Sequence, residues 1–316
     1  MGHIYNSVEE LVGHTPLLSL KRIKEKFKLK AHLFGKCECY NPAFSIKDRI
    51  AKNMLKSCRH KITKDTVFVE ATSGNTGIGL AAICASKGYK LVIIMPENMT
   101  RERICLIRHF GAEVILTPKE DGMKGALQKA EILRQKNPNV ILLNQFENKA
   151  NPEAHSLTTA TELLDDLNGN IDALVAGVGT SGTLTGISRT LKTCNPDLYV
   201  LAVEPKSSPV LKGGQAGTHQ IPGIGANFVP PFYDKSLVNE VIGIENEEAF
   251  QGAQISAALE GLSIGISAGA ALQAAIKLAK REEMKGKNIV VIFPDSIERY
   301  LSMRYFNDNL DSERLS

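Results

Sequence analysis

The chain has 316 residues and a mass of 34.4 kDa, enough to bury the cores of two domains. Its 38 basic and 34 acidic residues nearly balance and form no long basic run, which excludes a dedicated nucleic-acid surface. The six cysteines form no C-x-x-C pair and the seven histidines no H-x-x-x-H pair, so we expect a reduced, cytoplasmic protein without a metal site.

From about residue 65, short apolar runs alternate with segments of helical periodicity. Strands are predicted at Val67–Glu70, Leu91–Met95, Glu113–Leu116, Val140–Leu142, Ala173–Ala176, Tyr199–Val203 and Ile289–Phe293. Helices are predicted near residues 76–87, 101–109, 123–136, 154–167, 182–192, 247–260 and 268–282. Continuously apolar strands separated by helices indicate parallel sheets covered on both faces. The apolar runs have the length of strands and are too short to cross a bilayer, so no membrane partner is expected.

The first chemical signal lies ahead of these elements, in the segment from Asn41 to Arg49. Pro42 ends the preceding strand, and Ser45 is predicted to cap a helix that has Lys47 in its first turn. A cation is disfavoured at the positive end of a helix dipole, so an amine that works in its neutral form gains there. Neutral lysine is the nucleophile that reacts with carbonyl cofactors such as pyridoxal phosphate. Taken alone, the segment also fits a surface lysine paired with a nearby acid.

A second signal is the loop from Thr72 to Gly77, which follows a predicted strand and opens a helix. Glycine allows a close backbone approach, and free N–H groups at a helix start suit an anion such as a carboxylate. The alternative is an ordinary strand-to-helix turn with a threonine cap. This loop supplies Thr72, Ser73, Gly74, Asn75 and Thr76 as candidate ligand-binding residues.

A third signal, from Gly177 to Thr183, follows the strand Ala173–Ala176 and predicts a phosphate cradle. It also contains G-x-G-x-x-G, with Glu204 about 20 residues on, so a nicotinamide oxidoreductase stays open as an alternative. The flanking hydroxyls favour a terminal phosphate, which has more acceptor oxygens than an internal pyrophosphate. These hydroxyls belong to Thr180, Ser181 and Thr183.

A fourth signal is Ser267, in the glycine-containing segment 265–270 ahead of another predicted helix. It is either a simple N-cap or, if a pyridine cofactor is present, a hydrogen-bond partner of the ring nitrogen.

Together these segments resemble the pyridoxal-phosphate-dependent β-family, the group of cysteine synthases (O-acetylserine sulfhydrylases) and cystathionine β-synthases, over nearly the whole chain. The resemblance implies that Lys47 carries pyridoxal 5'-phosphate, that Ser267 meets its ring nitrogen and that Asn75 faces its 3′-oxygen. The phosphate would be bound by Gly179, Thr180, Ser181, Gly182 and Thr183. The substrate would be bound by Thr72, Ser73, Gly74, Asn75, Thr76 and Gln145, with Gly225 at the mouth.

Two positions depart from the family pattern. Ser181 stands where the family usually has glycine, which is tolerable if its φ is negative. Ala268 stands where a second serine is common.

The resemblance implies fold type II, as in the β subunit of tryptophan synthase. Each of two α/β domains would be a mostly parallel twisted sheet flanked by helices, with the cofactor in the cleft between them. Residues 41–148 would form the smaller, mobile domain, and residues 1–40 and 149–316 the larger one.

The activity implied is β-replacement, from O-acetyl-L-serine and sulfide to L-cysteine and acetate through an α-aminoacrylate, with Lys47 as general base. The alternatives are cystathionine synthesis from serine and homocysteine, cysteine desulfuration by the same residues, and a non-catalytic regulatory protein on the same fold. The resemblance further implies a homodimer and allows a partner, the C-terminal tail of serine acetyltransferase.

Overall fold

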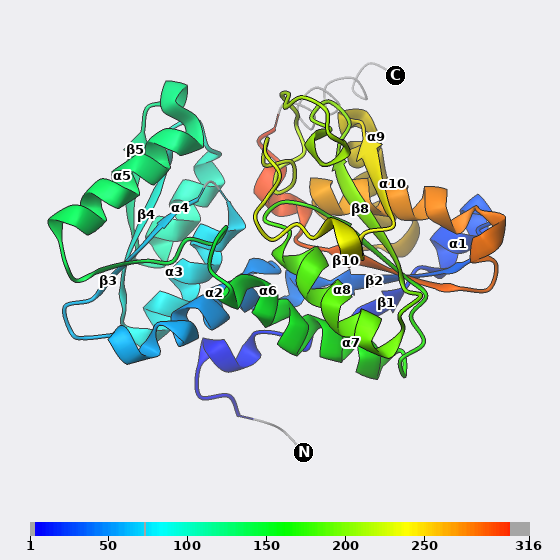
Figure 1. Ribbon diagram of the computed structural model, residues 1–316, viewed down its shortest axis with the longest axis horizontal. Helices are drawn as coiled ribbons and strands as arrows, with labels where there is room; N and C mark the ends of the chain where they lie inside the picture. The colour runs from blue at the N-terminus through cyan, green and yellow to red at the C-terminus, as the bar shows by residue number, and fades with distance from the viewer. Residues whose placement is uncertain (1–3, 73, 304–316) are drawn as a thin grey trace.

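The computed structural model describes residues 4–72 and 74–303, and its described strands lie in two separate sheets (Figure 1). The six-stranded sheet has the order β1-β2-β10-β7-β8-β9 and the four-stranded sheet the order β5-β4-β3-β6. Among the described strands, only β1 and β2 pair in antiparallel fashion. The strands are β1 Leu17–Ser19, β2 His32–Cys37, β3 Val67–Ala71, β4 Lys90–Pro96, β5 Glu113–Thr117, β6 Val140–Leu142, β7 Ala173–Gly177, β8 Tyr199–Pro205, β9 Glu240–Ile244 and β10 Asn288–Phe293.

The four-stranded sheet is drawn on the left of Figure 1 and is covered on both faces. Helix α5 (Gly122–Lys136) packs on one face through Ala126 and Ala130. On the other face lie α2 (Lys47–Ser57), α3 (Asn75–Lys87) and α4 (Arg101–His109), which share one apolar cluster with β3 and β4. Apolar strands are stable in this setting because neither face meets water.

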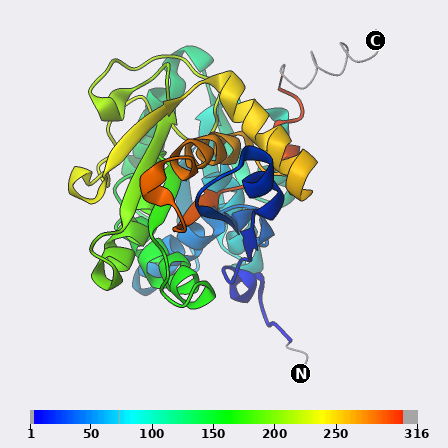
Figure 2. The same cartoon turned by 90° about the vertical axis from the view of Figure 1, so that its right-hand side faces the viewer.

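The six-stranded sheet is covered in the same way (Figure 2). Helices α1 (Lys21–Phe27), α9 (Asn246–Glu260) and α10 (Ile266–Ala279) pack on one face. Helices α7 (Ala160–Asp166) and α8 (Gly182–Cys194) pack on the other. No helix in the described ranges is long and apolar enough to span a membrane.

Helices α2 and α6 (Ala150–Ala154) lie between the two sheets and pack against each other (Figure 1). Helix α6 also contacts α8 and continues through one π-helical turn, His155–Thr159, into α7. The segment between the two sheets therefore links α2, which begins at Lys47, to α8, which follows the predicted phosphate loop.

The predicted fold class, two mostly parallel sheets covered by helices, is confirmed, and each predicted strand is present to within about two residues at either end. Edge strands β1 and β9 were not predicted. The strand expected ahead of Pro42 is β2, but it ends at Cys37 and a 3₁₀ turn over Glu38–Tyr40 follows, so Pro42 does not end it. The four-stranded sheet uses only residues between 67 and 142, which is compatible with the predicted division at residues 41 and 148. Helix α2 begins at Lys47 with Ile46 as N-cap; Ser45 instead accepts a hydrogen bond from the Lys47 N–H at 3.3 Å.

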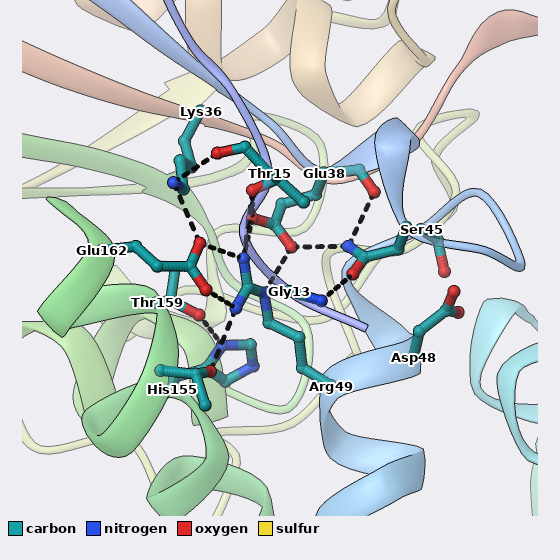
Figure 3. Close-up of polar contacts among 12 residues, drawn as sticks. Gly13, Thr15, Lys36, Glu38, Ser45, Asp48, Arg49, His155, Thr159 and Glu162 are labelled. Carbon is teal, nitrogen blue, oxygen red and sulfur yellow. Dashed lines mark hydrogen bonds and ion pairs between the residues drawn. The ribbon is translucent and has the colours of Figure 1, made fainter. Parts of the chain in front are cut away.

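A buried ion cluster ties α2 to the larger sheet (Figure 3). The Arg49 guanidinium donates to both carboxylate oxygens of Glu38, just after β2, at 2.7 and 2.9 Å. It also donates to both oxygens of Glu162, on α7, at 2.6 and 2.7 Å. Lys36 adds a second buried cation, 3.0 Å from Glu162. Lys36 also lies 3.1 Å from the half-exposed Asp166, so two cations face three carboxylates, and Thr15 satisfies further donors and acceptors between them.

Replacing Arg49 with methionine should destabilise the protein strongly, because Glu38 is then left buried without its cation. Breaking a buried ion pair in this way costs about 3–5 kcal/mol. The measurement is the urea midpoint of unfolding. The matched control is Arg134→Met, which removes the exposed ion pair of Arg134 with Glu131 and should leave the midpoint unchanged.

The deficit of Arg49→Met should shrink in acid. Burial alone would raise the pKa of Glu162, but hydrogen bonds from Arg49 and its charge outweigh burial and hold this pKa at about 2, below its usual 4.5. A depressed carboxyl pKa contributes stability that is complete above pH 4.5 and is lost as the pH falls toward about 2. A deficit that stays constant between about pH 7 and about pH 3 would contradict this assignment.

Candidate active site

The described helices α2, α3, α8 and α10 begin around one pocket between the two sheets. The pocket lies beyond the carboxyl ends of β7 and β10, where open parallel sheets bind their ligands. It brings together Lys47, Asn75, Gly179, Thr180, Ser181, Thr183 and Ser267, all predicted from sequence, with Gly223, Ile224 and Asp295.

Lys47 is the first residue of α2, and its half-buried side chain lines this pocket. Burial lowers the pKa of its amine, while the charges of Asp295 and Glu38 oppose that shift. The direction agrees with the neutral amine expected from sequence, but the principal cause is loss of water rather than the helix dipole. Burial therefore favours the neutral amine, which is the form that acts as a nucleophile or base.

The phosphate loop surrounds the start of α8. The Thr180 hydroxyl oxygen accepts from the Asn151 amide at 3.0 Å and from the Gly182 N–H at 3.3 Å, so its own proton is left for another acceptor. Gly179 has no room for a side chain, because a Cβ there would lie 2.4 Å from the carbonyl oxygen of Gly223. Backbone N–H groups and hydroxyl protons thus meet at a helix start, the arrangement that binds phosphate.

Ser181 does not have the negative φ that we assumed would make it tolerable. It is the N-cap of α8 with φ +66°, a left-handed conformation in which glycine has an advantage. Its hydroxyl lies 3.1 Å from that of Thr185, which donates its own proton to the Phe232 carbonyl at 2.8 Å. Ser181 is therefore the donor in this pair, and only its backbone N–H can donate to a phosphate.

The predicted carboxylate loop leads into α3. Gly74 is the N-cap of α3, with Asn75 as its first residue, and Ser73 lies outside the described residues. The Thr76 hydroxyl donates to Gln145 Oε1 at 2.7 Å, which brings together two residues 69 positions apart. The side chain and the backbone N–H of Gln145 also hydrogen-bond the buried Glu70 carboxyl. Thr72 is buried beside them, and its hydroxyl accepts from the Gly74 N–H at 3.3 Å.

Asn75 is held from the other side of the pocket by two residues that the sequence motifs missed. Its amide donates to Asp295 Oδ2 at 2.6 Å, and its oxygen accepts from Arg299 at 2.6 Å. Asp295 also accepts from Tyr300, while its Oδ1 is buried without a partner among the described residues. Asp295 is separated from the end of β10 only by Pro294, so its position at the carboxyl end of a central strand was the available signal.

The remaining predicted residues lie around the phosphate loop. Ser267 is buried in the first turn of α10 and lines the pocket. Gly225 lies behind the loop, where its N–H donates to the Val178 carbonyl at 2.9 Å. The structure does not bring Gly225 into the pocket lining.

Glu204, the acid expected of a dinucleotide site, is buried, and its carboxylate accepts from the Leu211 N–H at 2.8 Å. It stabilises the loop after β8 and does not line the pocket, which removes the support for a nicotinamide site.

The pocket fits a carbonyl cofactor with a phosphate tail. The backbone of Gly223 lies so close to Gly179 that residue 179 can offer a ligand only its backbone. Hydroxyl donors stand beside it at the start of α8. A lysine with a lowered pKa and a pyridine-compatible serine, Ser267, line the same space.

Residues 8–295 match the model of a family described as pyridoxal-phosphate dependent enzyme. The chain belongs to that family. Pyridoxal phosphate is accordingly its cofactor, as predicted, and the alternative of a nicotinamide enzyme was wrong.

Named relatives extend the likeness over the whole chain. Cysteine synthase A of Escherichia coli K12 is 46% identical, covering 100% of this chain and 99% of its own length. A cysteine synthase from Entamoeba histolytica superposes with a TM-score of 0.93 at 38% identity, over 96% of this chain and 91% of that one. A hydrogen sulfide-producing enzyme from Fusobacterium nucleatum superposes at 0.90 with 44% identity, over 94% and 100%. The predicted resemblance to cysteine synthases is confirmed.

The left-handed conformation of Ser181 makes a testable prediction about this pyridoxal-phosphate enzyme. Ser181→Gly relieves about 1–2 kcal/mol of backbone strain but loses a hydrogen bond worth about 0.5–1.5 kcal/mol, so the melting temperature should hardly change. Ser181→Ala keeps the strain and loses the hydrogen bond, so its melting temperature should be lower than that of the wild type and of Ser181→Gly.

Affinity for the cofactor provides the second measurement. It should stay within about twofold in Ser181→Gly, because the hydroxyl proton is already donated to Thr185. A tenfold loss of affinity in that variant would show that the hydroxyl binds the phosphate after all.

Proposed function

We propose that this protein is a cysteine synthase that converts O-acetyl-L-serine and sulfide to L-cysteine and acetate. The observation that carries the proposal is a single pocket that joins Lys47 to a phosphate loop on one side and to the Asn75 loop on the other. The match to a cysteine synthase over the full length of the chain supports the same substrates.

The chain has a binding group for each part of the cofactor. The N–H groups of residues 179–183 and the hydroxyls of Thr180 and Thr183 would hold the phosphate, and Ser267 would meet the ring nitrogen. When bound, pyridoxal phosphate supplies a carbonyl carbon for the amine of Lys47 and a ring that withdraws electrons from the substrate's α-carbon. A serine hydroxyl holds the ring nitrogen protonated less firmly than a carboxylate would, which favours loss of a β-substituent.

Lys47 moves the proton. Burial lowers the pKa of its amine, so Nζ can be neutral and accept the α-proton of the amino acid. The substrate's carboxylate is bound at the start of α3 by Thr72, Gly74, Asn75, Thr76 and Gln145, together with Ser73. Acetate is a far better leaving group than hydroxide, so the acetylated donor should react faster than serine.

The test compares O-acetylserine, O-phosphoserine, serine and cysteine as donors, each with sulfide and with homocysteine. O-acetylserine with sulfide should have the highest kcat/KM. Higher efficiency for serine with homocysteine would replace the proposal by cystathionine synthesis, and faster release of sulfide from cysteine alone would replace it by desulfuration.

Two lysine variants on one helix test the role of Lys47. Lys47→Ala should lower kcat/KM by about 10²–10⁴-fold, the usual contribution of an acid–base group. Lys56→Ala alters an exposed residue of the same helix α2 and should leave kcat/KM unchanged. Equal activity of both variants would show that the pocket lysine takes no part in the reaction, as in a non-catalytic regulatory protein.

We further infer a partner, the C-terminal tail of a serine acetyltransferase. A chain terminus carries a carboxylate, and the start of α3 offers the donors that bind the substrate's carboxylate. From the same resemblance we also propose that the protein is a homodimer. We propose further that it divides into a smaller, mobile domain at 41–148 and a larger domain. The cytoplasmic location is supported by six free cysteines in the described residues.

A short peptide that ends in isoleucine should therefore compete with O-acetylserine. The same peptide with an amidated C-terminus loses the charge-assisted hydrogen bonds, so it should bind about ten- to a hundred-fold more weakly in calorimetry. Equal binding of the acid and amide forms would reject capture of the carboxylate, and no heat with either would reject the partner.

A further inference from the structure

A row of hydrogen-bond donors lies behind the phosphate loop and is not explained by the motifs of the sequence. It belongs to one continuous helical stretch, α6 followed by the π-helical turn His155–Thr159. π-Helical turns are rare and occur often at functional sites. Figure 3 shows His155 and Thr159 side by side next to the Arg49 cluster, and the turn contacts α8 on its other side.

The first donor in this row is Asn151. Its amide nitrogen donates to the Gln145 carbonyl at 2.8 Å and to the Thr180 hydroxyl at 3.0 Å, so both N–H groups have oxygen acceptors. A Cβ at Gly182 would lie 2.0 Å from Asn151 Oδ1, which shows how closely the two segments approach. The Thr180 hydroxyl is thereby an acceptor on its rear side and a donor toward the pocket.

The second member of the row is His155, which is fully buried. Its Nε2 lies 3.2 Å from the Thr183 hydroxyl and its Nδ1 lies 2.9 Å from the Thr159 hydroxyl. A neutral imidazole has one donor and one acceptor nitrogen, so only two arrangements exist. Either His155 donates to Thr183 and accepts from Thr159, or Thr183 gives its only proton to His155.

We propose that His155 is a positioning residue, held as the neutral Nε2–H tautomer, which donates to Thr183 and thereby directs the Thr183 hydroxyl proton at a phosphate dianion in the pocket. A dianion only accepts hydrogen bonds, so the opposite tautomer would face it with an oxygen lone pair. Thr180 and Thr183 then act alike, each backed by an N–H group from the same helical stretch. This inference rests on the proposed function only in requiring that the ligand carry a phosphate group.

The surroundings keep the imidazole neutral. Burial is the main reason that the pKa of His155 lies well below its usual value; the positive charges of Lys47 and Arg49 lower this pKa further, and Glu162 opposes them. An imidazolium would donate from both nitrogens and turn the Thr159 proton away. The neutral form is therefore the one present throughout the physiological range.

Two substitutions separate this role from simple filling of the core. His155→Gln keeps an N–H donor near the position of Nε2, whereas His155→Leu keeps bulk without a donor. The probes are pyridoxal phosphate and pyridoxal, which lacks the phosphate. His155→Leu should weaken pyridoxal phosphate about ten- to a hundred-fold and leave pyridoxal unchanged, while His155→Gln should stay within about threefold of wild type for both. His109→Gln, at an exposed position of α4, is the matched control.

Nitrogen-15 NMR of histidine-labelled wild type gives a readout that does not need a folded Leu variant. The signals lost in His155→Gln identify His155, and Nε2 should be the protonated nitrogen at neutral pH. A protonated Nδ1, or an imidazolium, would overturn the proposal. So would equal loss of affinity in the Gln and Leu variants, or a Leu variant that binds both probes like wild type. Wild type that binds neither pyridoxal phosphate nor inorganic phosphate would instead refute the proposed function.

Discussion

The position of Lys47 depends on the buried ion cluster of Arg49, two residues further along α2. Arg49 is held from two directions, by Glu38 after β2 and by Glu162 on α7, and both partners belong to the side of the larger sheet. Two further contacts tie the start of the same helix to the strand end at β10: the Ile46 N–H donates to the Pro294 carbonyl at 2.8 Å, and Ser45 forms a β-bridge with Asp295. By its contacts, the start of α2 is therefore fixed to the larger sheet, although α2 packs along its length on α3. Charged side chains are costly to bury, and here their bonds hold the first turn of α2, which carries Lys47, against the larger sheet.

Asn75 reaches the same region from the smaller sheet. Its amide meets Asp295 and Arg299, which follow β10, so a single side chain connects the start of α3 with the carboxyl end of the larger sheet. The contrast with Arg49 is informative. Arg49 makes several charge-assisted bonds in a fully closed environment, whereas Asn75 makes two at the edge of the pocket. The start of α2, which carries Lys47, is thus tied to the larger sheet by more charge-assisted bonds than the start of α3 is.

More of the fold than of the site could be predicted from the sequence. Parallel strands such as β4 and β8 are continuously apolar because both faces are covered, and that pattern is visible in the sequence. Edge strand β9 was missed because it contains Gly243 and is only half-buried. In the site, loops that carry glycine and hydroxyl residues have a recognisable local sequence pattern, which is why Lys47, Asn75 and residues 179–183 could be predicted. Asp295, Arg299 and His155 could not, because each acts through partners more than 25 residues away, and such contacts depend on tertiary packing. The φ of Ser181 was equally hidden, since its hydroxyl partner is a helix turn away and the backbone conformation depends on the whole loop.

The starts of α3, α8 and α10 share one property that suits them to bind an anion. The N-caps of α3 and α10 are Gly74 and Gly265, which have no side chain to satisfy the first N–H groups, and the Ser181 hydroxyl at α8 is turned toward Thr185. Helix α9, away from the pocket, has a complete capping box between Glu245 and Glu248. Side-chain caps normally satisfy these donors, so leaving them out would destabilise a helix by about 1 kcal/mol unless a ligand replaces the cap. Helices α1, α4 and α5, away from the pocket, also lack a side-chain cap, so an uncapped start is not in itself a binding site. The starts of α3, α8 and α10 differ because residues there line the pocket, where a phosphate at α8 or a carboxylate at α3 would accept from the free N–H groups and meet the positive end of the dipole.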